Sequence, residues 1–149
     1  MVPRSAAIST ELSIKGSEVA AGLLDTSVVI DWDDQAVAAA LPDEVAVCAV
    51  TIAELAAGPH LASSGAERAN RQARLQQVEA LFEPVPFDAV GARSYGLIVA
   101  AVVEAGRSHR SRVADLLIAA TAHAHHLALY TRNPDDFTGL DTLVSVVGI

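Results

Sequence analysis

The chain has 149 residues, of which 52% are hydrophobic and only 4% aromatic, and its formal net charge at pH 7 is −8. This length predicts one domain with an aliphatic core, and so few aromatic residues argue against an aromatic platform that stacks nucleobases. The single cysteine, Cys48, excludes an internal disulfide and a cysteine-based zinc site.

Charge is distributed unevenly along the chain. No Lys or Arg lies between Lys15 and Arg68, whereas all but two of the arginines lie between Arg68 and Arg112. Folding can therefore place a basic rim beside an acidic pocket, although the net charge is negative. No apolar segment is long enough to span a bilayer and the N-terminus does not resemble a secretory signal, so we expect a cytoplasmic protein without membrane contact.

The first predicted strand follows an N-terminal extension. Residues 1–20 show no clear hydrophobic period, so we expect a loosely ordered segment there, and one domain over 21–149. Residues 21–25 form an apolar run that predicts a central strand ending on Asp25. Residues 27–32 and 35–41 resemble short helices. Asp25 is also a good helix cap, so a purely structural role is an open alternative.

The next segment predicts a second buried strand and two helices. Residues 45–50 are apolar and rich in valine, which is typical of a parallel strand. Thr51 and Glu54 have the spacing of a capping box, which predicts a helix that ends at Gly58-Pro59. Glu54 can thus serve either as a cap or as a site residue. Residues 66–82 predict a long amphipathic helix.

The following segment predicts two further helices. Residues 83–87 indicate an extended connector or short strand, after which Asp88 caps a helix that Gly106 stops. Ser111 is placed to cap the helix predicted over 113–126, which is apolar nearly all round and must be buried. Asp115 lies in its first turn, where an unpaired carboxylate would cost several kcal/mol, so it needs donors, a cation or a metal.

Two strands complete the predicted fold. Residues 127–131 form one, a polar turn follows over 132–137, and residues 143–147 form the last. Strands and helices therefore alternate, which predicts an α/β fold with a mostly parallel central sheet of about five strands and helices on both faces.

Several polar residues occupy comparable places in this fold. Asp25 ends a strand, Glu54 lies one helical turn past a strand, Asp115 begins a buried helix, and Asn133 with Asp136 follows another strand end. A doubly wound sheet gathers such positions along one edge. Two carboxylates about 5 Å apart repel each other by roughly 3 kcal/mol at an effective dielectric of 20, so a bare cluster would be unstable.

A hard divalent cation relieves that repulsion. Mg²⁺ and Mn²⁺ prefer carboxylate oxygens and keep several water ligands. Such a cation can orient a phosphodiester, lower the pKa of an attacking water and stabilise the leaving oxygen. The sequence therefore indicates metal-dependent phosphodiester hydrolysis.

Four motifs in order carry a family resemblance: 23–27 (LLDTS), 51–55 (TIAEL), 112–122 (RVADLLIAATA) and 131–137 (TRNPDDF). Together they resemble a PIN-domain ribonuclease of the VapC toxin type, from about Gly22 to the C-terminus. Each motif alone is a weak signal, but the four in this order are specific. The extension before Gly22 departs from the family pattern, in which the first strand begins almost at the first residue.

The resemblance implies an Mg²⁺-dependent endoribonuclease, with Mn²⁺ able to substitute, that is the toxin of a type II toxin–antitoxin pair. Its partners would be RNA, a VapB-like antitoxin and a second copy of the chain. The residues that carry over are the metal ligands Asp25 and Asp115, the third acid Glu54 and the supporting residue Ser27. Either Asn133 or Asp136 completes the acidic centre, with Asp136 taken as the catalytic acid and Asn133 as a supporting residue.

The same resemblance implies a function for the basic loop that precedes Asp115. Arg107, Arg110 and Arg112 are candidates for contact with RNA phosphates at the rim of the site. Solubility or helix capping is an equal alternative for these arginines. His123, His125 and His126 suggest a transition-metal cluster, but capping at a helix end is the better interpretation.

Two other functions are compatible with the sequence. A catalytically silent PIN-like module would act only through partner binding. An aspartate-based phosphatase would use Asp25 as phospho-acceptor, but it needs a second aspartate where this chain has Ser27. Loss of metal-dependent RNA cleavage in an Asp25→Asn variant would separate these functions from the nuclease.

Overall fold

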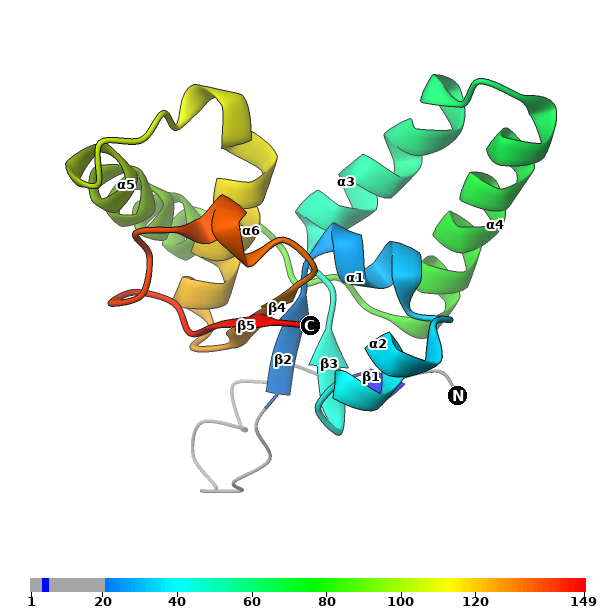
Figure 1. Ribbon diagram of the computed structural model, residues 1–149, viewed down its shortest axis with the longest axis horizontal. Coiled ribbons are helices and arrows are strands. Elements are labelled where there is room, and N and C mark those ends of the chain that lie inside the picture. Colours follow the sequence, from blue (N-terminus) through cyan, green and yellow to red (C-terminus); the bar gives the residue numbers. More distant parts are fainter. Residues whose placement is uncertain (1–3, 6–20) are drawn as a thin grey trace.

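The computed structural model describes residues 4–5 and 21–149. Within them, five strands form one sheet in the order β1-β3-β2-β4-β5, and every neighbouring pair is parallel (Figure 1). The strands are β1 (Arg4–Ser5), β2 (Ala21–Leu24), β3 (Glu44–Ala46), β4 (Ala128–Thr131) and β5 (Val146–Gly148). The predicted parallel sheet of about five strands is confirmed.

Helices fill most of the connections between the strands. The α-helices are α1 (Thr26–Asp31), α2 (Gln35–Ala40), α3 (Ala49–Ala57), α4 (Gly65–Leu81), α5 (Ala89–Glu104) and α6 (Val113–Ala124). Short 3₁₀ turns are η2 (Gly58–Leu61), η3 (Arg110–Arg112) and η4 (Pro134–Phe137). Among the described residues, no helix combines the length and the apolar character that a membrane crossing requires.

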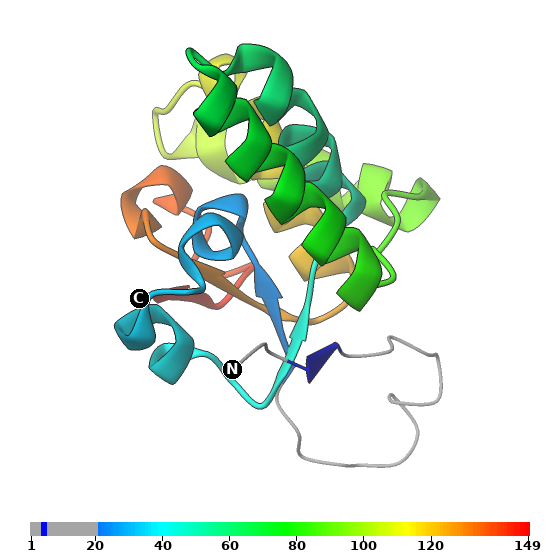
Figure 2. The ribbon, with the colours of Figure 1, turned by 90° about the vertical axis from the view of Figure 1, so that its right-hand side faces the viewer.

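The sheet carries a hydrophobic core on each face. Successive residues of a strand point to opposite faces, and accordingly Leu23 belongs to the core shared with α5 and α6, whereas Leu24 belongs to the core shared with α1, α2 and α4. Ala46 and Val45 divide in the same way. Figures 1 and 2 show the two groups of helices on either side of the sheet. The prediction of helices on both faces is confirmed.

The order of the strands places a crevice beside β2. The chain runs from β2 to β3 on one side, and returns later to β4 on the other side of β2. In open α/β sheets, a reversal of this kind leaves the carboxyl ends of the strands uncovered, which is where ligands bind. Asp25 follows β2 directly and Thr131 ends β4, so the topology brings them together.

The predicted capping box is wrong, and so is the end of the predicted strand 45–50. Helix α3 begins at Ala49, with Cys48 as an N-cap that makes no side-chain hydrogen bond. Beyond β3, the chain pairs with residues 83–87 through an isolated parallel bridge between Cys48 and Val85 and its backbone hydrogen bonds. A single bridge is too short to count as a strand, so 83–87 is a connector. Thr51 and Glu54 consequently lie inside the helix, and Glu54 is available for the site.

Two smaller differences concern the ends of α6. Ser111 does not cap α6, whose N-cap is Arg112 without a side-chain hydrogen bond. The helix ends at Ala124, before His126 takes a positive φ of 55°. The expectation of a loosely ordered extension over 1–20 lies outside the described residues, except that Arg4–Ser5 form the edge strand β1.

Candidate active site

Asp25 is held rigidly at the junction of β2 and α1. It is 5% exposed. Its Oδ1 accepts a hydrogen bond from the Thr26 backbone N–H at 2.9 Å, and its Oδ2 accepts from the hydroxyls of Ser27 at 3.0 Å and Thr131 at 2.8 Å. Asp25 therefore caps α1, as the structural alternative supposed. An ionised carboxylate offers about four lone-pair sites, so one remains for a further ligand.

Burial dominates the chemistry of Asp25. Burial raises the pKa of this carboxyl above its ordinary value, and the negative charge of Asp136 raises the pKa further. The hydrogen bonds from Thr131, Ser27 and Thr26 lower it. Removal from water makes the charged form costly. A cation nearby would relieve that cost.

Glu54 reaches the same region from α3. The Thr26 hydroxyl donates to Glu54 Oε1 at 2.7 Å, and the Thr51 hydroxyl lies 3.1 Å from the Thr26 hydroxyl. Thr26 thus contacts two acids, because its backbone N–H binds Asp25 and its side chain binds Glu54. This fixes the position of Glu54 relative to Asp25.

The charges of the other three predicted acids act on Asp115. Burial and the charges of Asp25, Asp136 and Glu54 raise the pKa of Asp115 to about 6, while the charge of Arg112 lowers it. Charges on distant sides of a protein surface are screened and would not act in this way. Acids separated by up to 111 positions in sequence therefore share one electrostatic environment.

Of the two candidates in the turn after β4, Asp136 is the one whose charge acts on the other acids. Asp136 Oδ1 forms an ion pair with Arg112 at 2.7 Å, and its charge acts on both Asp25 and Asp115. The backbone N–H of Asn133 donates to the Thr131 hydroxyl, but the residue itself is exposed. Asn133 acts on Asp25 only through Thr131.

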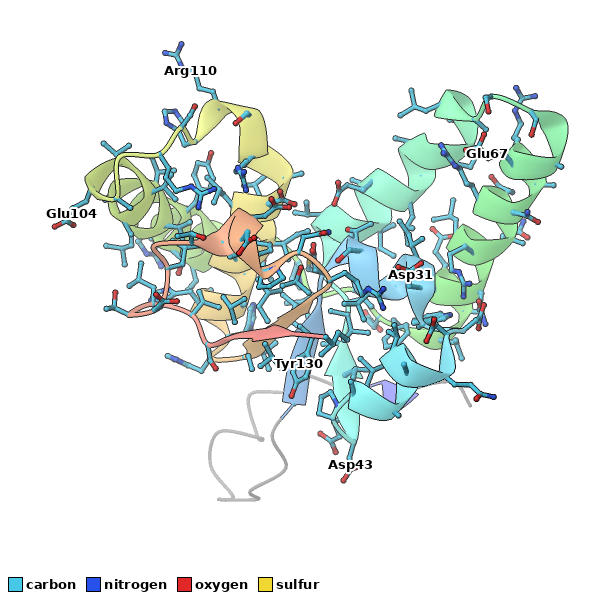
Figure 3. The ribbon with its side chains drawn as sticks, viewed as in Figure 1. Asp31, Asp43, Glu67, Glu104, Arg110 and Tyr130 are labelled. Carbon is cyan, nitrogen blue, oxygen red and sulfur yellow. The ribbon has the colours of Figure 1, made fainter. Side chains whose placement is uncertain are left out.

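The three predicted RNA-contact arginines differ in their surroundings. Arg112 is engaged with Asp136, and Arg107 donates to the backbone carbonyl of Asp135 at 3.1 Å. Arg110 is exposed and points away from the molecule at the start of the α6 segment (Figure 3). Arg110 is therefore the member of this group whose charge is most available to a ligand.

A pocket of about 460 Å³ adjoins Glu54 between α1, α3 and α4. Two of its lining residues are arginines that hold helices together: Arg71 donates to the carbonyl of Gly58 at 2.8 Å, and Arg74 pairs with Asp33 and lies over the Trp32 ring. The other lining residues are Thr26, Ile30, Glu54, Leu55, Gly58 and Asn70. The pocket thus extends the acidic site toward α4.

The donor set fits a hydrated, oxygen-preferring cation. Carboxylates that raise one another's pKa are stabilised by a divalent ion, and an all-oxygen set favours Mg²⁺ or Mn²⁺ over zinc. In the part of the chain that the structure describes, no three His, Cys, Asp or Glu side chains come close enough to enclose an ion by themselves. A divalent ion bound there would be held by one or two of these carboxylates, and water or a substrate phosphate would complete its coordination shell.

Of the three histidines near the end of α6, His123 lies within the helix, whereas His125 and His126 follow its last residue, Ala124. His123 Nδ1 hydrogen-bonds with the Ser94 hydroxyl at 2.9 Å, which joins α6 to α5. No cluster with His125 and His126 is present among residues 21–149.

Two residues of the site were not predicted from the sequence. Thr26 fixes Glu54, and the fully buried Thr131 donates to Asp25. Both are hydroxyl residues at strand ends, which is a visible signal in the sequence. Their partners depend on strand order, which the sequence does not display.

Metal-free protein is expected to lose stability as the pH rises from about 4 to 6, the range between the ordinary pKa of 3.8 and the folded value for Asp115. In this range the folded state binds more protons than the unfolded state, so the free energy of unfolding falls with pH. The lowered pKa values of Glu67 and Asp88 act only toward the acidic end. Urea denaturation in EDTA at pH 5 and 7 should show a smaller pH effect for Asp115→Asn than for wild type. An equal effect of pH on the free energy of unfolding of the two proteins would contradict the raised pKa of Asp115.

Known proteins that resemble this chain agree with the fold. The family model described as PIN domain matches residues 22–142. Ribonuclease VapC5 of Mycobacterium tuberculosis is 42% identical over 129 residues, which cover 85% of this chain and 93% of that protein. Ribonuclease VapC8 of the same species is 36% identical over 105 residues, covering 70% and 93% respectively.

Solved structures give the same result. The crystal structure of VapBC-5 from Mycobacterium tuberculosis, a member of the VapBC family of toxin–antitoxin systems, matches with a TM-score of 0.74 at 41% identity, covering 87% of this chain and 98% of that chain. FitAcB from Neisseria gonorrhoeae matches with a TM-score of 0.70 at 32% identity, covering 85% and 96%.

Proposed function

The chain belongs to the PIN-domain family, and we propose that it is the VapC-type toxin of a type II toxin–antitoxin pair, an endoribonuclease that hydrolyses RNA phosphodiester bonds with a divalent cation. The observation that carries this proposal is the set of contacts that gathers the acids: Thr26 joins Asp25 to Glu54, Arg112 pairs with Asp136, and the charges of these three acids raise the pKa of Asp115. The ribonucleases VapC5 and VapC8 support the activity.

The roles of the acids follow from their contacts. Asp25 and Asp115 are the proposed metal ligands, and Mg²⁺ is the proposed ion, for which Mn²⁺ can substitute. When bound, the ion polarises the scissile phosphate and lowers the pKa of a water ligand. Glu54 is held through Oε1 by Thr26, so its Oε2 is the atom proposed to accept the proton of the attacking water.

Asp136 and Ser27 shape this centre from its edge. The ion pair with Arg112 orients the Asp136 carboxylate and balances part of its charge. Ser27 donates to Asp25 and accepts a hydrogen bond from the Arg132 backbone N–H at 3.1 Å, so it ties α1 to the turn after β4. Both contacts preorganise the acids before substrate arrives.

The cognate partner is a VapB-like antitoxin. VapBC-5 is a member of a family of toxin–antitoxin systems, and this chain covers almost all of the VapBC-5 chain it matches. A tightly bound antitoxin would keep RNA from the acidic site.

The test of the proposed function is RNA cleavage by the purified full chain. We expect cleavage with Mg²⁺ or Mn²⁺ and none with excess EDTA, because the acids alone repel a phosphodiester. A folded chain that leaves RNA intact with both ions would instead be a silent binding module. Metal-dependent hydrolysis of a phosphate monoester without RNA cleavage would identify a phosphatase.

Arg110 is proposed to bind an RNA phosphate at the rim. Replacement of Arg110 with alanine should weaken RNA binding for all sequences alike and lower the slope of log K against log salt by about 0.7, the value for one phosphate contact on a single strand. The matched control is Arg68→Ala, an exposed arginine of α4. Fluorescence anisotropy at several salt concentrations measures the affinity for RNA and the salt slope of each variant. An unchanged slope for Arg110→Ala would exclude the contact.

A further inference from the structure

The pocket of about 460 Å³ opens directly beside the proposed catalytic acid Glu54. It is formed by α1, α3 and α4, which lie together on one side of the molecule (Figure 1). Thr26 and Glu54, which belong to the acidic site, are part of its wall. An RNA strand whose phosphate lies at the acids therefore has this pocket within reach of a neighbouring nucleotide.

One wall of the pocket is apolar. Ile30 lines the pocket and is nevertheless 55% exposed. It lies one helical turn after Thr26 on α1, so the two side chains are on the same face of that helix. The buried Leu55 continues the wall from α3. An exposed isoleucine beside a group of acids offers a contact to a flat apolar group rather than to an ion.

The two arginines of the pocket are already held by other groups. Arg71 pairs with Glu67 and donates to the carbonyl of Gly58 at 2.8 Å. Arg74 pairs with Asp33. A guanidinium fixed in this way keeps its planar surface for stacking on a nucleobase, whereas part of its charge is already balanced. The pocket therefore favours a base over a second phosphate.

Asn70 adds a polar group to the same pocket. It is exposed on α4, and its amide takes no part in the contacts that hold Arg71 and Arg74. The amide carries a donor and an acceptor side by side, a pattern that pairs with the edge of a base. Asn70 thus supplies the selectivity that an apolar wall lacks.

We propose that this pocket binds the base of an RNA nucleotide next to the scissile phosphate, and that Ile30 and Asn70 determine which base is preferred there. Ile30 and the guanidinium planes contact the faces of the base, and Asn70 hydrogen-bonds with its edge. The site depends on the proposed nuclease function, because RNA bound at the acids is what brings the base to the pocket.

Binding of nucleotides without cleavage tests the pocket. The isotope-labelled full chain is titrated in EDTA with each of the four nucleoside monophosphates of RNA, and with ribose phosphate as the matched probe that lacks a base. We expect the NMR signals of the Asn70 amide and the Ile30 methyl groups to shift with at least one nucleotide but not with ribose phosphate. Equal shifts with ribose phosphate would assign the pocket to phosphate and overturn the proposal, as would the absence of any shift.

The base preference at the cut tests the role of Asn70. In Asn70→Ala, the preference in kcat/KM among the four bases at one position beside the cleaved bond should fall from at least about fivefold to within about twofold, because one bidentate contact discriminates by that factor or more. Alanine is the better helix former, so the melting temperature should not fall. The matched control Gln72→Ala, at an exposed α4 residue outside the pocket lining, should keep the wild-type preference. An unchanged preference in Asn70→Ala would overturn the proposal.

An RNA that lacks the base at this position tests both contacts together. The abasic RNA should lower kcat/KM of wild type by about tenfold, because stacking and edge contacts are both lost. The double variant Ile30→Ala/Asn70→Ala should cleave intact and abasic RNA at rates within about twofold of each other. The matched control Leu61→Ala, at an exposed leucine of η2, should respond as wild type does. A double variant that still loses about tenfold on the abasic RNA would place the base elsewhere.

The two kinds of measurement separate this proposal from the proposed function. A chain that cleaves no RNA, but whose pocket signals shift with nucleotides and not with ribose phosphate, would contradict the nuclease function and support the base pocket. A chain that cleaves RNA with Mg²⁺, but whose pocket signals do not respond to nucleotides, would support the nuclease function and overturn the base pocket.

Discussion

Replacing Asp115 with asparagine is expected to lower the rate of metal-dependent RNA cleavage by about a thousandfold, since a metal ligand at a reacting phosphate contributes several kcal/mol. The same change should raise the melting temperature of the metal-free protein by a few degrees at neutral pH. Burial and three acidic neighbours raise the pKa of Asp115 to about 6, so its ionised form destabilises the folded chain at pH 7. Asparagine removes that charge.

The two measurements distinguish loss of catalysis from loss of folding. A variant that merely unfolds would lose activity but would melt at a lower temperature. The matched control is Asp141→Asn, an exposed aspartate outside the site, which should change neither quantity. Initial rates on a defined RNA and melting followed by circular dichroism in EDTA are the measurements. An Asp115→Asn variant that cleaves RNA as fast as wild type would remove Asp115 from the site.

Addition of Mg²⁺ is expected to raise the melting temperature of the wild-type protein by roughly 5–10 °C at a hundredfold excess over its dissociation constant. A ligand that binds only the folded state contributes about 2.7 kcal/mol at that excess, and each kcal/mol shifts the melting temperature of a chain of this size by about 3 °C. Asp25 is fixed by three hydrogen bonds in a geometry that leaves one lone pair free, so little ordering cost opposes binding.

The Asp25→Asn variant provides the contrast. Its amide cannot replace the charge, so the melting temperature should respond weakly to Mg²⁺. The variant itself should fold, because burial already penalises the charged form of Asp25 and the hydroxyls of Ser27 and Thr131 can rotate to accept from the amide. An equal rise for wild type and Asp25→Asn would place the Mg²⁺ elsewhere.

Much of the fold was predictable because the strands have a clear hydrophobic pattern. The apolar runs that end at Asp25 and Thr131 are strands β2 and β4, and alternating strands and helices gave the parallel sheet. The start of α3 was not predictable from its capping pattern. Cys48 is the N-cap of that helix and makes no side-chain hydrogen bond to it. Cys48 instead pairs with Val85 of a distant segment, a contact that the local sequence does not reveal.

The candidate site was predictable in its acids but not in their partners. Each acid stands at a strand end or in a helix turn that the hydrophobic pattern could locate. The hydrogen bond from Thr26 to Glu54 and the ion pair between Arg112 and Asp136 depend on how α3, η3 and η4 pack together. Arg112 therefore appeared in sequence as one of three equivalent basic residues, although Arg112 pairs with Asp136, whereas Arg110 is exposed and points outward (Figure 3).

The central claim is that Asp25 and Asp115 bind one divalent cation between them. Anomalous X-ray diffraction from crystals of the wild-type chain grown with Mn²⁺ tests it most directly. We predict an anomalous peak at about 2.1 Å from carboxylate oxygens of both residues, close to the distance of octahedral Mg²⁺ coordination. Well-ordered crystals with no peak there, or with Mn²⁺ bound only to other side chains, would contradict it.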